Sequence, residues 1–567
     1  VWFSSLLPRS ASRQPCPALL DQQFAGQPPC LVGHRWQAAA AAASAAAARV
    51  VQMRAAGAKP RRWARYVRRV TGGYVCAEGA SYAHHSYANR RACEAPVPTA
   101  PPPTADAEYR DRFLEWARCV PGDPSTTLAC EKFVRHAFFG TPPEALSREA
   151  LATWLHCHLG LGGSSGASAA APLGSAARPL ETLMAALGSA APAAACSSEP
   201  LASFVFREGP ISAWYKPLPL KALIEVQHRV ARRRLAVDGF VELRDAALPS
   251  VRYWVRGSIR DGETPLLVLH GYGRGLASPL FKEFLPQLAR KVVVIVECPW
   301  LLVTRVPFAD DITGTPSVRE IARGVAGFLA KRFPAERGGA QESHEQVPAL
   351  EIDILGHSFG SAVASALVRE LAGDGPERER CTLAVRRVVL MDPMCFMPGI
   401  TKQAQLLQRA PKDLAVELLE EAVPGSPGPS CWEIFRYGFL RPDPCRSVDD
   451  EGAAARERRH WVLFQTYFFN YFIFRDLMYS WVNSRVLHGS EYLDRGHLRS
   501  LNRSGRMLTV LAETDLMIPA ALLRDDLASE ALASAAGGVL WLPIVGHGAC
   551  QHLPEVTERI RSFLSAS

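Results

Sequence analysis

A single serine stands between two glycines in a setting that suits nucleophilic chemistry. Ser358 is the centre of Gly356-His357-Ser358-Phe359-Gly360, a Gly-x-Ser-x-Gly motif. Residues 350–355 alternate apolar and polar side chains and predict a short buried strand, and residues 362–371 predict a helix. A sharp turn from strand to helix exposes the central hydroxyl, and the flanking glycines relieve crowding there. We therefore predict that Ser358 is a nucleophile.

A histidine that could serve as the base for this serine lies near the C-terminus. His547 stands between two glycines after a predicted strand at 539–542, so its ring has room to turn into a cleft. His552 is an alternative base, although its position beside the last predicted helix is more typical of a structural or surface histidine. We predict that His547 takes the proton of Ser358.

Two aspartates compete for the role of the acid that orients the base. Asp515 follows a predicted strand at 508–511 and precedes His547, which gives the chain order Ser, Asp, His. Asp392 directly follows a predicted strand at 388–391. Some enzymes built on a sheet of parallel strands carry the acid after the corresponding strand. A carboxylate at either position can hold the histidine tautomer. We predict Asp515, with Asp392 as the alternative acid and Glu513 as a minor third choice.

A glycine-rich turn offers hydrogen-bond donors for a developing oxyanion. His270-Gly271-Tyr272-Gly273 follows a predicted strand at 266–269. The backbone N–H groups of Tyr272 and of Phe359, the residue after the serine, are the donors we expect in an oxyanion hole.

Short apolar runs alternate with helical patterns and must position these groups. Such runs between helices predict a parallel sheet that is covered on both faces, with the site at the carboxyl ends of its strands. The predicted strands are 251–256, 266–269, 292–296, 350–355, 388–391, 508–511 and 539–542, and the predicted helices are 317–333, 362–371 and 554–564.

On these motifs, residues from about 204 to the C-terminus resemble the α/β-hydrolase superfamily. The resemblance implies an α/β fold with a mostly parallel central sheet, helices on both faces and a helical cap inserted after strand 6. The segments 271–276, 392–396 and 467–481 are also similar to a poorly characterised fungal and algal group of serine hydrolases, which implies no defined substrate. One departure is Ser361, which stands where many members have a second glycine.

The predicted cap, about 397–505, contains a run rich in aromatic residues. We expect most of these side chains to pack the cap onto the core and a few to line an apolar acyl pocket. The aromatic residues are Phe464, Tyr467, Phe468, Phe469, Tyr471, Phe472, Phe474, Tyr479 and Trp481.

The chain before residue 204 has a different composition. Residues 1–105 contain 13 Lys/Arg and 3 Asp/Glu, so this segment accounts for the net charge of +9, and the remainder is near neutral. We expect a low-complexity basic extension that is a plastid or mitochondrial targeting segment, a membrane-surface helix or a disordered tail. Residues 106–160 predict a small helical segment, and 161–203 a Gly/Ala/Ser-rich linker. Because the first residue is Val, we expect a piece of a longer protein.

These features predict an enzyme that cleaves a carboxylic ester, preferably lipid-like or with a long acyl chain, through an acyl-enzyme intermediate. The triad requires no cofactor, and none of the 14 cysteines has zinc-site spacing. A small-molecule ester or lipid is the expected partner. The near-neutral catalytic region argues against nucleic acid, and the basic N-terminal segment suggests membrane-surface association. An acyltransferase, a thioesterase and a non-catalytic binding scaffold are the alternatives.

Overall fold

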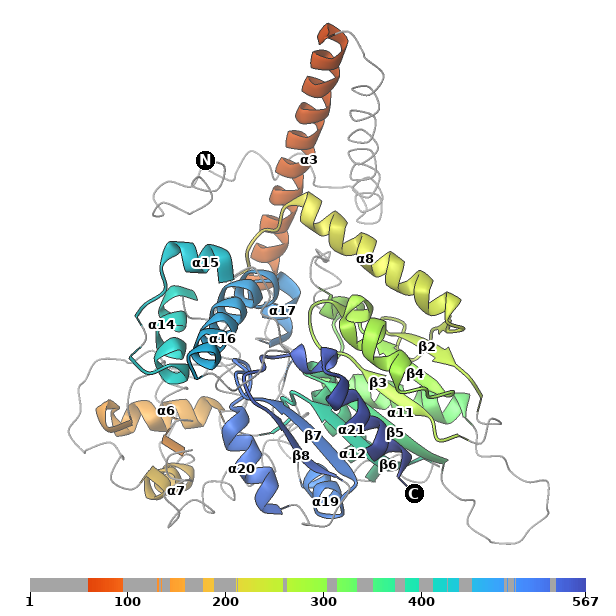
Figure 1. Ribbon diagram of the computed structural model, residues 1–567, viewed down its shortest axis with the longest axis vertical. Helices are drawn as coiled ribbons and strands as arrows, with labels where there is room; N and C mark the ends of the chain where they lie inside the picture. Colours follow the sequence, from red (N-terminus) through yellow and green to blue (C-terminus); the bar gives the residue numbers. More distant parts are fainter. Residues whose placement is uncertain are drawn as a thin grey trace. The chain divides into compact units, whose positions relative to one another are not determined.

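An eight-stranded sheet forms the centre of the chain (Figure 1). The strand order is β1-β2-β4-β3-β5-β6-β7-β8, in which β1–β2 and β2–β4 pair antiparallel and all other neighbours pair parallel. The strands are β1 (Val241–Leu243), β2 (Arg252–Arg256), β3 (Leu266–Leu269), β4 (Val293–Glu297), β5 (Leu350–His357), β6 (Leu383–Met391), β7 (Met507–Ala512) and β8 (Gly538–Leu542).

The computed structural model describes part of the chain. The described residues are 60–94, 130–131, 134, 143–158, 177–187, 211, 213–258, 263–302, 314–333, 350–372, 383–396, 411–425, 427–437, 451–483, 487, 494, 496–530 and 537–566. The chain divides into two compact units, Val1–His85 and Ser86–Ser567, and the second contains the sheet.

The central strands are apolar on both sides because helices cover both faces of the sheet. In β4, Val294 and Val296 pack in the same cluster as α11 (Val318–Arg332) and α12 (Phe359–Ala372). Their neighbours Val293 and Ile295 pack instead with η6 (Leu280–Phe284) and α21 (Pro554–Ser565). This alternation follows from the two-residue period of a strand. The predicted α/β-hydrolase fold is confirmed by this strand order and by the helices on both faces.

Helix α11 begins directly after Ser317, the first residue of the helix predicted at 317–333. The Ser317 hydroxyl accepts from the Glu320 N–H at 3.2 Å, and the Glu320 carboxylate accepts from the Ser317 N–H at 2.7 Å. This reciprocal capping box satisfies two backbone donors that have no partner inside the helix.

The segment between β6 and β7, here called the insertion, interrupts the alternation of strands and helices. Its described elements fall within the predicted cap at 397–505, of which 397–410, 438–450 and most of 484–495 lie outside the described residues. These elements are α14 (Pro411–Ala422), α15 (Cys431–Tyr437), α16 (Glu451–Phe464), the π-helix η9 (Gln465–Phe474), α17 (Leu477–Trp481) and α19 (His497–Arg503).

Helices also occur before the sheet. Residues 1–59 of the predicted basic extension lie outside the described residues, and α3 (Pro60–Glu94) follows them. The predicted helical segment contains α6 (Arg148–His158). Within the tract predicted to be a linker, α7 (Ala177–Leu187) buries Leu180, Leu183 and Leu187, an apolar face that the small-residue composition conceals. Among the described helices, none combines the length and the hydropathy that crossing a bilayer would need.

A long helix precedes β1 and was not predicted. The helix α8 (Leu218–Val237) has 20 residues, and Pro219 lies in its first turn, where a missing N–H costs no hydrogen bond. Its inner face buries His228 and Leu235. Helix α20 (Ala520–Glu530) connects β7 to β8 in the chain.

Candidate active site

Ser358 occupies a strained turn between β5 and α12. Its φ angle is +52°, a left-handed conformation that is unusual for a residue with a side chain. A Cβ atom at position 360 would lie 2.1 Å from the backbone oxygen of Leu269, so only glycine fits beside β3. The close approach of β3 to the start of α12 therefore requires glycine at position 360, and the sharp turn holds the Ser358 side chain away from the backbone.

The structure brings Ser358, His547 and Asp515 into one hydrogen-bonded row. The His547 Nε2 atom lies 3.0 Å from Ser358 Oγ, and its Nδ1 atom lies 2.6 Å from Asp515 Oδ2. All three residues are buried. The other Asp515 oxygen accepts from the N–H groups of Met517 and Ile518 at 2.7 and 3.2 Å, which fixes the carboxylate in its turn after β7.

The charge state of His547 reflects its carboxylate neighbours. Burial alone would lower its pKa, but the Asp515 carboxylate reverses this effect and, with a further contribution from Asp392, raises the pKa to about 8. Because Nδ1 faces a carboxylate, this nitrogen carries the proton and Nε2 accepts from the serine hydroxyl when the ring is neutral.

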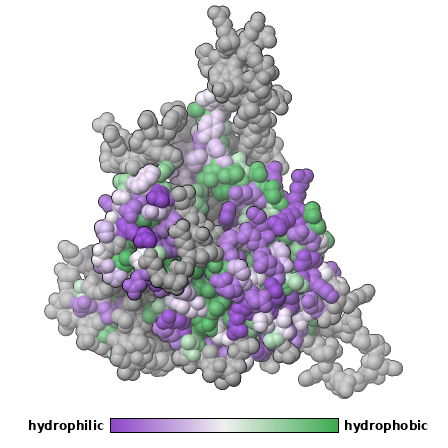
Figure 2. All heavy atoms as spheres, in the orientation of Figure 1, coloured by the Kyte–Doolittle hydropathy of each residue, from purple (hydrophilic) through white to green (hydrophobic). Residues whose placement is uncertain are grey.

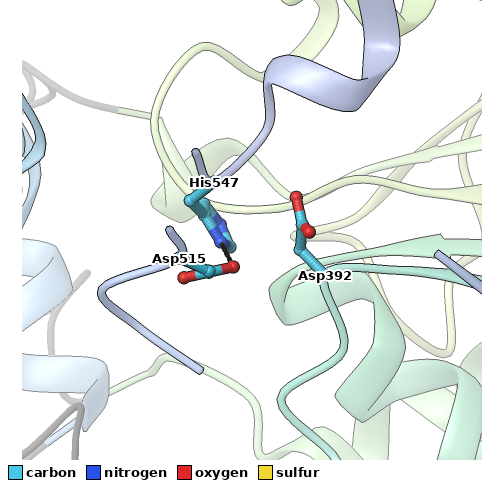
Figure 3. A group of neighbouring side chains, drawn as sticks. All are labelled: Asp392, Asp515 and His547. Atoms are coloured by element: carbon cyan, nitrogen blue, oxygen red, sulfur yellow. Dashed lines mark hydrogen bonds and ion pairs between the residues drawn. The ribbon is translucent and has the colours of Figure 1, made fainter. Parts of the chain in front are cut away.

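Asp392 lies close to the same histidine but contacts the backbone beside it. In Figure 3 the Asp392 carboxylate lies to the right of the His547 ring, whereas the Asp515 carboxylate lies below the ring and is hydrogen-bonded to it. One Asp392 oxygen accepts from the Gly548 N–H at 2.7 Å, and the other accepts from the Ala512 N–H at 3.3 Å. One carboxylate oxygen of Asp392, one of Asp515 and one ring nitrogen of His547 all lie within 4.8 Å of one another. Burial, and then the charge of Asp515, raise the pKa of Asp392 to about 6.

The other two candidates have different partners. His552 Nδ1 lies 2.8 Å from Glu283 Oε2, so the alternative base is paired with an acid of η6. Glu513 accepts from the Ile544 N–H at 2.7 Å and faces Arg458. Both residues thus have structural contacts that explain them without a role in the row.

The predicted oxyanion donors lie next to the serine. A Cβ atom at Gly271 would be 2.7 Å from Ser358 Cβ, so the turn before Tyr272 lies against Ser358. Phe359 is the first residue of α12, where backbone N–H groups have no acceptor within the helix. The rings of Tyr272 and Phe359 also pack together, with centroids 4.9 Å apart.

His270 fixes this glycine-rich turn from inside the core. Its Nε2 atom accepts from the Cys298 N–H at 3.1 Å, so its Nδ1 atom carries the proton and donates to the Gly271 oxygen at 2.8 Å. Burial lowers the pKa of His270, which keeps the ring neutral and this tautomer in place.

Ser361 has a role that the sequence did not reveal. Its hydroxyl donates to the Ser358 carbonyl at 2.6 Å and accepts from the Met394 N–H at 2.9 Å. Ser361 thus fits beside the strand at a position where a glycine was the alternative, and it links the turn of Ser358 to the segment after β6.

Gln465, at the start of η9, is the second residue that the sequence analysis missed. Its Oε1 atom accepts from the N–H groups of His547 at 3.0 Å and Leu516 at 3.4 Å. Its Nε2 atom donates to the Thr514 carbonyl at 2.7 Å. One buried amide therefore holds the turns of Asp515 and His547 together. The only sequence signal is a polar residue at the head of an aromatic run.

The aromatic residues predicted to belong to the cap, from Phe464 to Trp481, fall into two groups. Phe464, Phe474, Tyr479 and Trp481 are buried and pack the insertion onto the core. The half-buried group consists of Tyr467, Phe468, Phe469, Tyr471 and Phe472. The Phe469 ring meets His547 edge to face, with centroids 6.2 Å apart, so this second group begins beside the row of Ser358.

The chain has structural but no sequence matches among the proteins compared. No protein-family model matches it. No curated protein matches it. A membrane phospholipase A described as a bacterial virulence factor is 17% identical, with a TM-score of 0.32, over 61% of this chain and 91% of that one.

Two esterases show a similar likeness. Esterase RhEst1 from Rhodococcus sp. ECU1013 is 17% identical, with a TM-score of 0.32, over 58% of this chain and 99% of that one. Carboxylesterase CesB from Bacillus subtilis is 12% identical, with a TM-score of 0.32, over 61% and 99% of the two chains.

Proposed function

We propose that this protein is a serine hydrolase that cleaves a carboxylic ester through an acyl-enzyme intermediate. The observation that carries this proposal is the row in which Ser358 Oγ lies 3.0 Å from His547 Nε2 and Asp515 lies 2.6 Å from His547 Nδ1. A binding scaffold has no need of a serine at φ +52° facing a histidine that a carboxylate orients.

In the first half of the reaction, Ser358 Oγ forms a bond to the ester carbonyl carbon while its proton moves to His547 Nε2. The negative charge on the carbonyl oxygen is stabilised by the backbone N–H groups of Tyr272 and Phe359. Asp515 remains ionised and stabilises the imidazolium. When the carbon–oxygen bond of the ester breaks, His547 returns the proton to the leaving alcohol.

In the second half, a water molecule attacks the acyl group on Ser358. His547 takes a proton from this water, and the same two N–H groups stabilise the second oxyanion. The bond to Ser358 Oγ then breaks, and His547 protonates the serine, which releases the carboxylic acid and restores the starting state.

The half-buried aromatic residues favour an apolar acyl group. Phe469 lies against His547, and Phe468 stacks between Phe464 and Phe472 with centroid distances of 4.8 and 4.4 Å. An acyl chain that extends from Ser358 toward these rings gains contact with apolar surface that is incompletely buried by the protein itself. Lipid-like or long-chain esters are therefore the substrates we expect.

Labelling with a fluorophosphonate probe tests the nucleophile. We expect the wild-type protein to be labelled and Ser358→Ala to be unlabelled. Ser365→Ala, which changes another buried serine in the helix that follows Ser358, is the matched control and should be labelled. Circular dichroism and thermal melting show whether each variant is folded. Labelling of folded Ser358→Ala equal to that of the wild type would overturn the proposal.

Chain-length dependence tests the substrate class. We expect kcat/KM to rise from p-nitrophenyl acetate to esters with longer acyl chains and to fall when Phe469→Ala is introduced, mainly for the longer esters. Free acid should be the product. If an added alcohol captured the acyl group in preference to water, an acyltransferase would be indicated instead.

A further inference from the structure

Helix α8 has an apolar strip on its solvent-exposed side. Leu223, Val226 and Val230 are 55%, 56% and 61% exposed, and Val237 at the end of the helix is 86% exposed. Their spacing of three, four and seven residues places all four on one face, whereas Leu235 on the opposite face is buried. Single exposed valines are ordinary on a protein surface, but four in one row form a continuous apolar strip.

Cationic side chains border this strip. Arg229, Arg233 and Arg234 are exposed, and at 100° per residue the first two lie on one side of the strip and the third on the other. Residues 218–237 contain five Lys/Arg and one Glu. In Figure 2, hydrophobic and hydrophilic residues lie next to one another over the region where Figure 1 shows α8.

The start of α8 is attached to the insertion. In the segment just before Leu218, the backbone N–H of Trp214 donates to the backbone carbonyl of Arg475 at 2.8 Å, and the Lys216 ammonium pairs with the Asp476 carboxylate at 3.3 Å. Trp214, which is 40% exposed, also meets the ring of Tyr471. The apolar strip is therefore tied to the half-buried aromatic group beside the row of Ser358.

We propose that α8 is a docking surface that lies in the interface of an anionic lipid bilayer. The strip would enter the boundary of the acyl chains, and the bordering arginines would meet the lipid phosphates and carboxylates, as in other amphipathic interfacial helices. A second copy of this chain fits less well: although Arg229 pairs with Glu225 and Arg234 with Asp238, residues 218–237 keep a net positive charge, so two such helices would repel each other.

Docking has a consequence for substrate supply that rests on the proposed function. A lipid ester leaves the bilayer with its apolar chain shielded only if an apolar surface is near. Because Trp214 and Tyr471 connect α8 to the insertion, the docked protein would present its aromatic group close to the lipid surface. The docking itself does not depend on hydrolysis, so the two claims can be tested separately.

Flotation with lipid vesicles tests docking with the full-length protein. We expect binding to vesicles of phosphatidylcholine mixed with phosphatidylserine and weaker binding to phosphatidylcholine alone. The double variant Val226→Asp/Val230→Asp should weaken binding by roughly tenfold or more, because two apolar side chains no longer leave water. Val416→Asp is the matched control, since Val416 is a valine on α14 that is 46% exposed.

A charge reversal tests the electrostatic part. Arg233→Glu should weaken binding to the mixed vesicles by about fivefold or more, and added salt should reduce this difference. Lys412→Glu, an exposed cation at the start of α14, is the control and should bind as the wild type does. Hydrolysis of a water-soluble short-chain ester should be unchanged in all of these variants.

Three results would overturn the docking proposal. They are equal vesicle binding by the wild type and the double variant, no binding to anionic vesicles, and a dimer in sedimentation experiments that Val226→Asp/Val230→Asp dissociates. Ser358→Ala should float with vesicles as the wild type does. Loss of hydrolysis without loss of flotation in this variant separates a failure of the proposed function from a failure of the docking surface.

Discussion

Asp392 accepts a 2.7 Å hydrogen bond from the backbone N–H of Gly548, the residue after the proposed base. Asp515 instead contacts the His547 ring itself at Nδ1. The two aspartates that compete in the sequence thus have different contacts: one faces the imidazole and the other holds the turn that carries it. Substitutions of the two aspartates should therefore have different effects on activity.

Asp515→Asn should reduce kcat by about a thousandfold or more, because an amide that donates to Nδ1 favours the wrong tautomer of His547. Asp392→Asn should retain most of the activity, since the asparagine oxygen can still accept from Gly548 and only the longer 3.3 Å contact with the Ala512 N–H is lost. Steady-state kinetics with a soluble ester, on variants with wild-type melting behaviour, measure both. The assignment of the acid would be wrong if only the Asp392 variant lost its activity.

The pH dependence of kcat/KM should report the proton on His547. The neutral ring is the active form, so kcat/KM should rise with pH through the His547 pKa of about 8. Asp392→Asn removes a negative charge that favours the imidazolium, so its rising limb should move to lower pH. Glu283→Gln, which changes the acid paired with His552, should leave the profile in place. A shift to higher pH in the Asp392 variant would contradict this account.

Gln465→Ala should lower both stability and activity. The substitution leaves the buried His547 N–H and Thr514 carbonyl without this partner, at a cost of about 1–3 kcal/mol for each group left unsatisfied. We also expect a lower kcat with little change in KM for a short ester, because the turns of acid and base lose their common anchor. Gln287→Ala, on an exposed surface, is the control for urea unfolding and kinetics. A kcat equal to that of the wild type in Gln465→Ala would show that Gln465 does not position His547 and Asp515.

Arg232→Ala should destabilise the protein more than Arg229→Ala, although both arginines lie on α8. Arg232 pairs at 2.7 Å with Glu297, whose side chain is fully buried. Its removal leaves this carboxylate with the Trp254 indole N–H at 2.9 Å and Arg252 at 4.0 Å, so we expect a cost of about 2–3 kcal/mol, below that of a wholly unpaired buried charge. Arg229 and Glu225 form an exposed pair, which contributes roughly 0–1 kcal/mol. Denaturant unfolding monitored by fluorescence compares them, and equal effects would show that burial of Glu297 does not matter.

Much of the row of Ser358, His547 and Asp515 could be predicted because it depends on local patterns. The short apolar strands, the glycines around Ser358 and the order of Asp515 and His547 all carry their signal within a few residues. The choice between Asp515 and Asp392 stayed open in the sequence because both follow parallel strands whose ends meet at one edge of the sheet. Only the positions of Gly548 and the His547 ring separate them.

Contacts between distant segments could not be predicted. Glu283, the partner of His552, lies 269 residues earlier in the chain, and Gln465 meets His547 across 82 residues. The exposed side of α8 was equally hidden, because its inner and outer faces both carry apolar residues and only packing shows which face meets the core. The π-helix η9 likewise has no distinct periodic signal in an aromatic run.

Gln465 belongs to the insertion but anchors the turns of both Asp515 and His547. A change in the position of η9 that moved Gln465 would therefore reach the backbone of His547 and of the Asp515 turn together, so that the geometry of the row depends on a segment that lies outside the sheet.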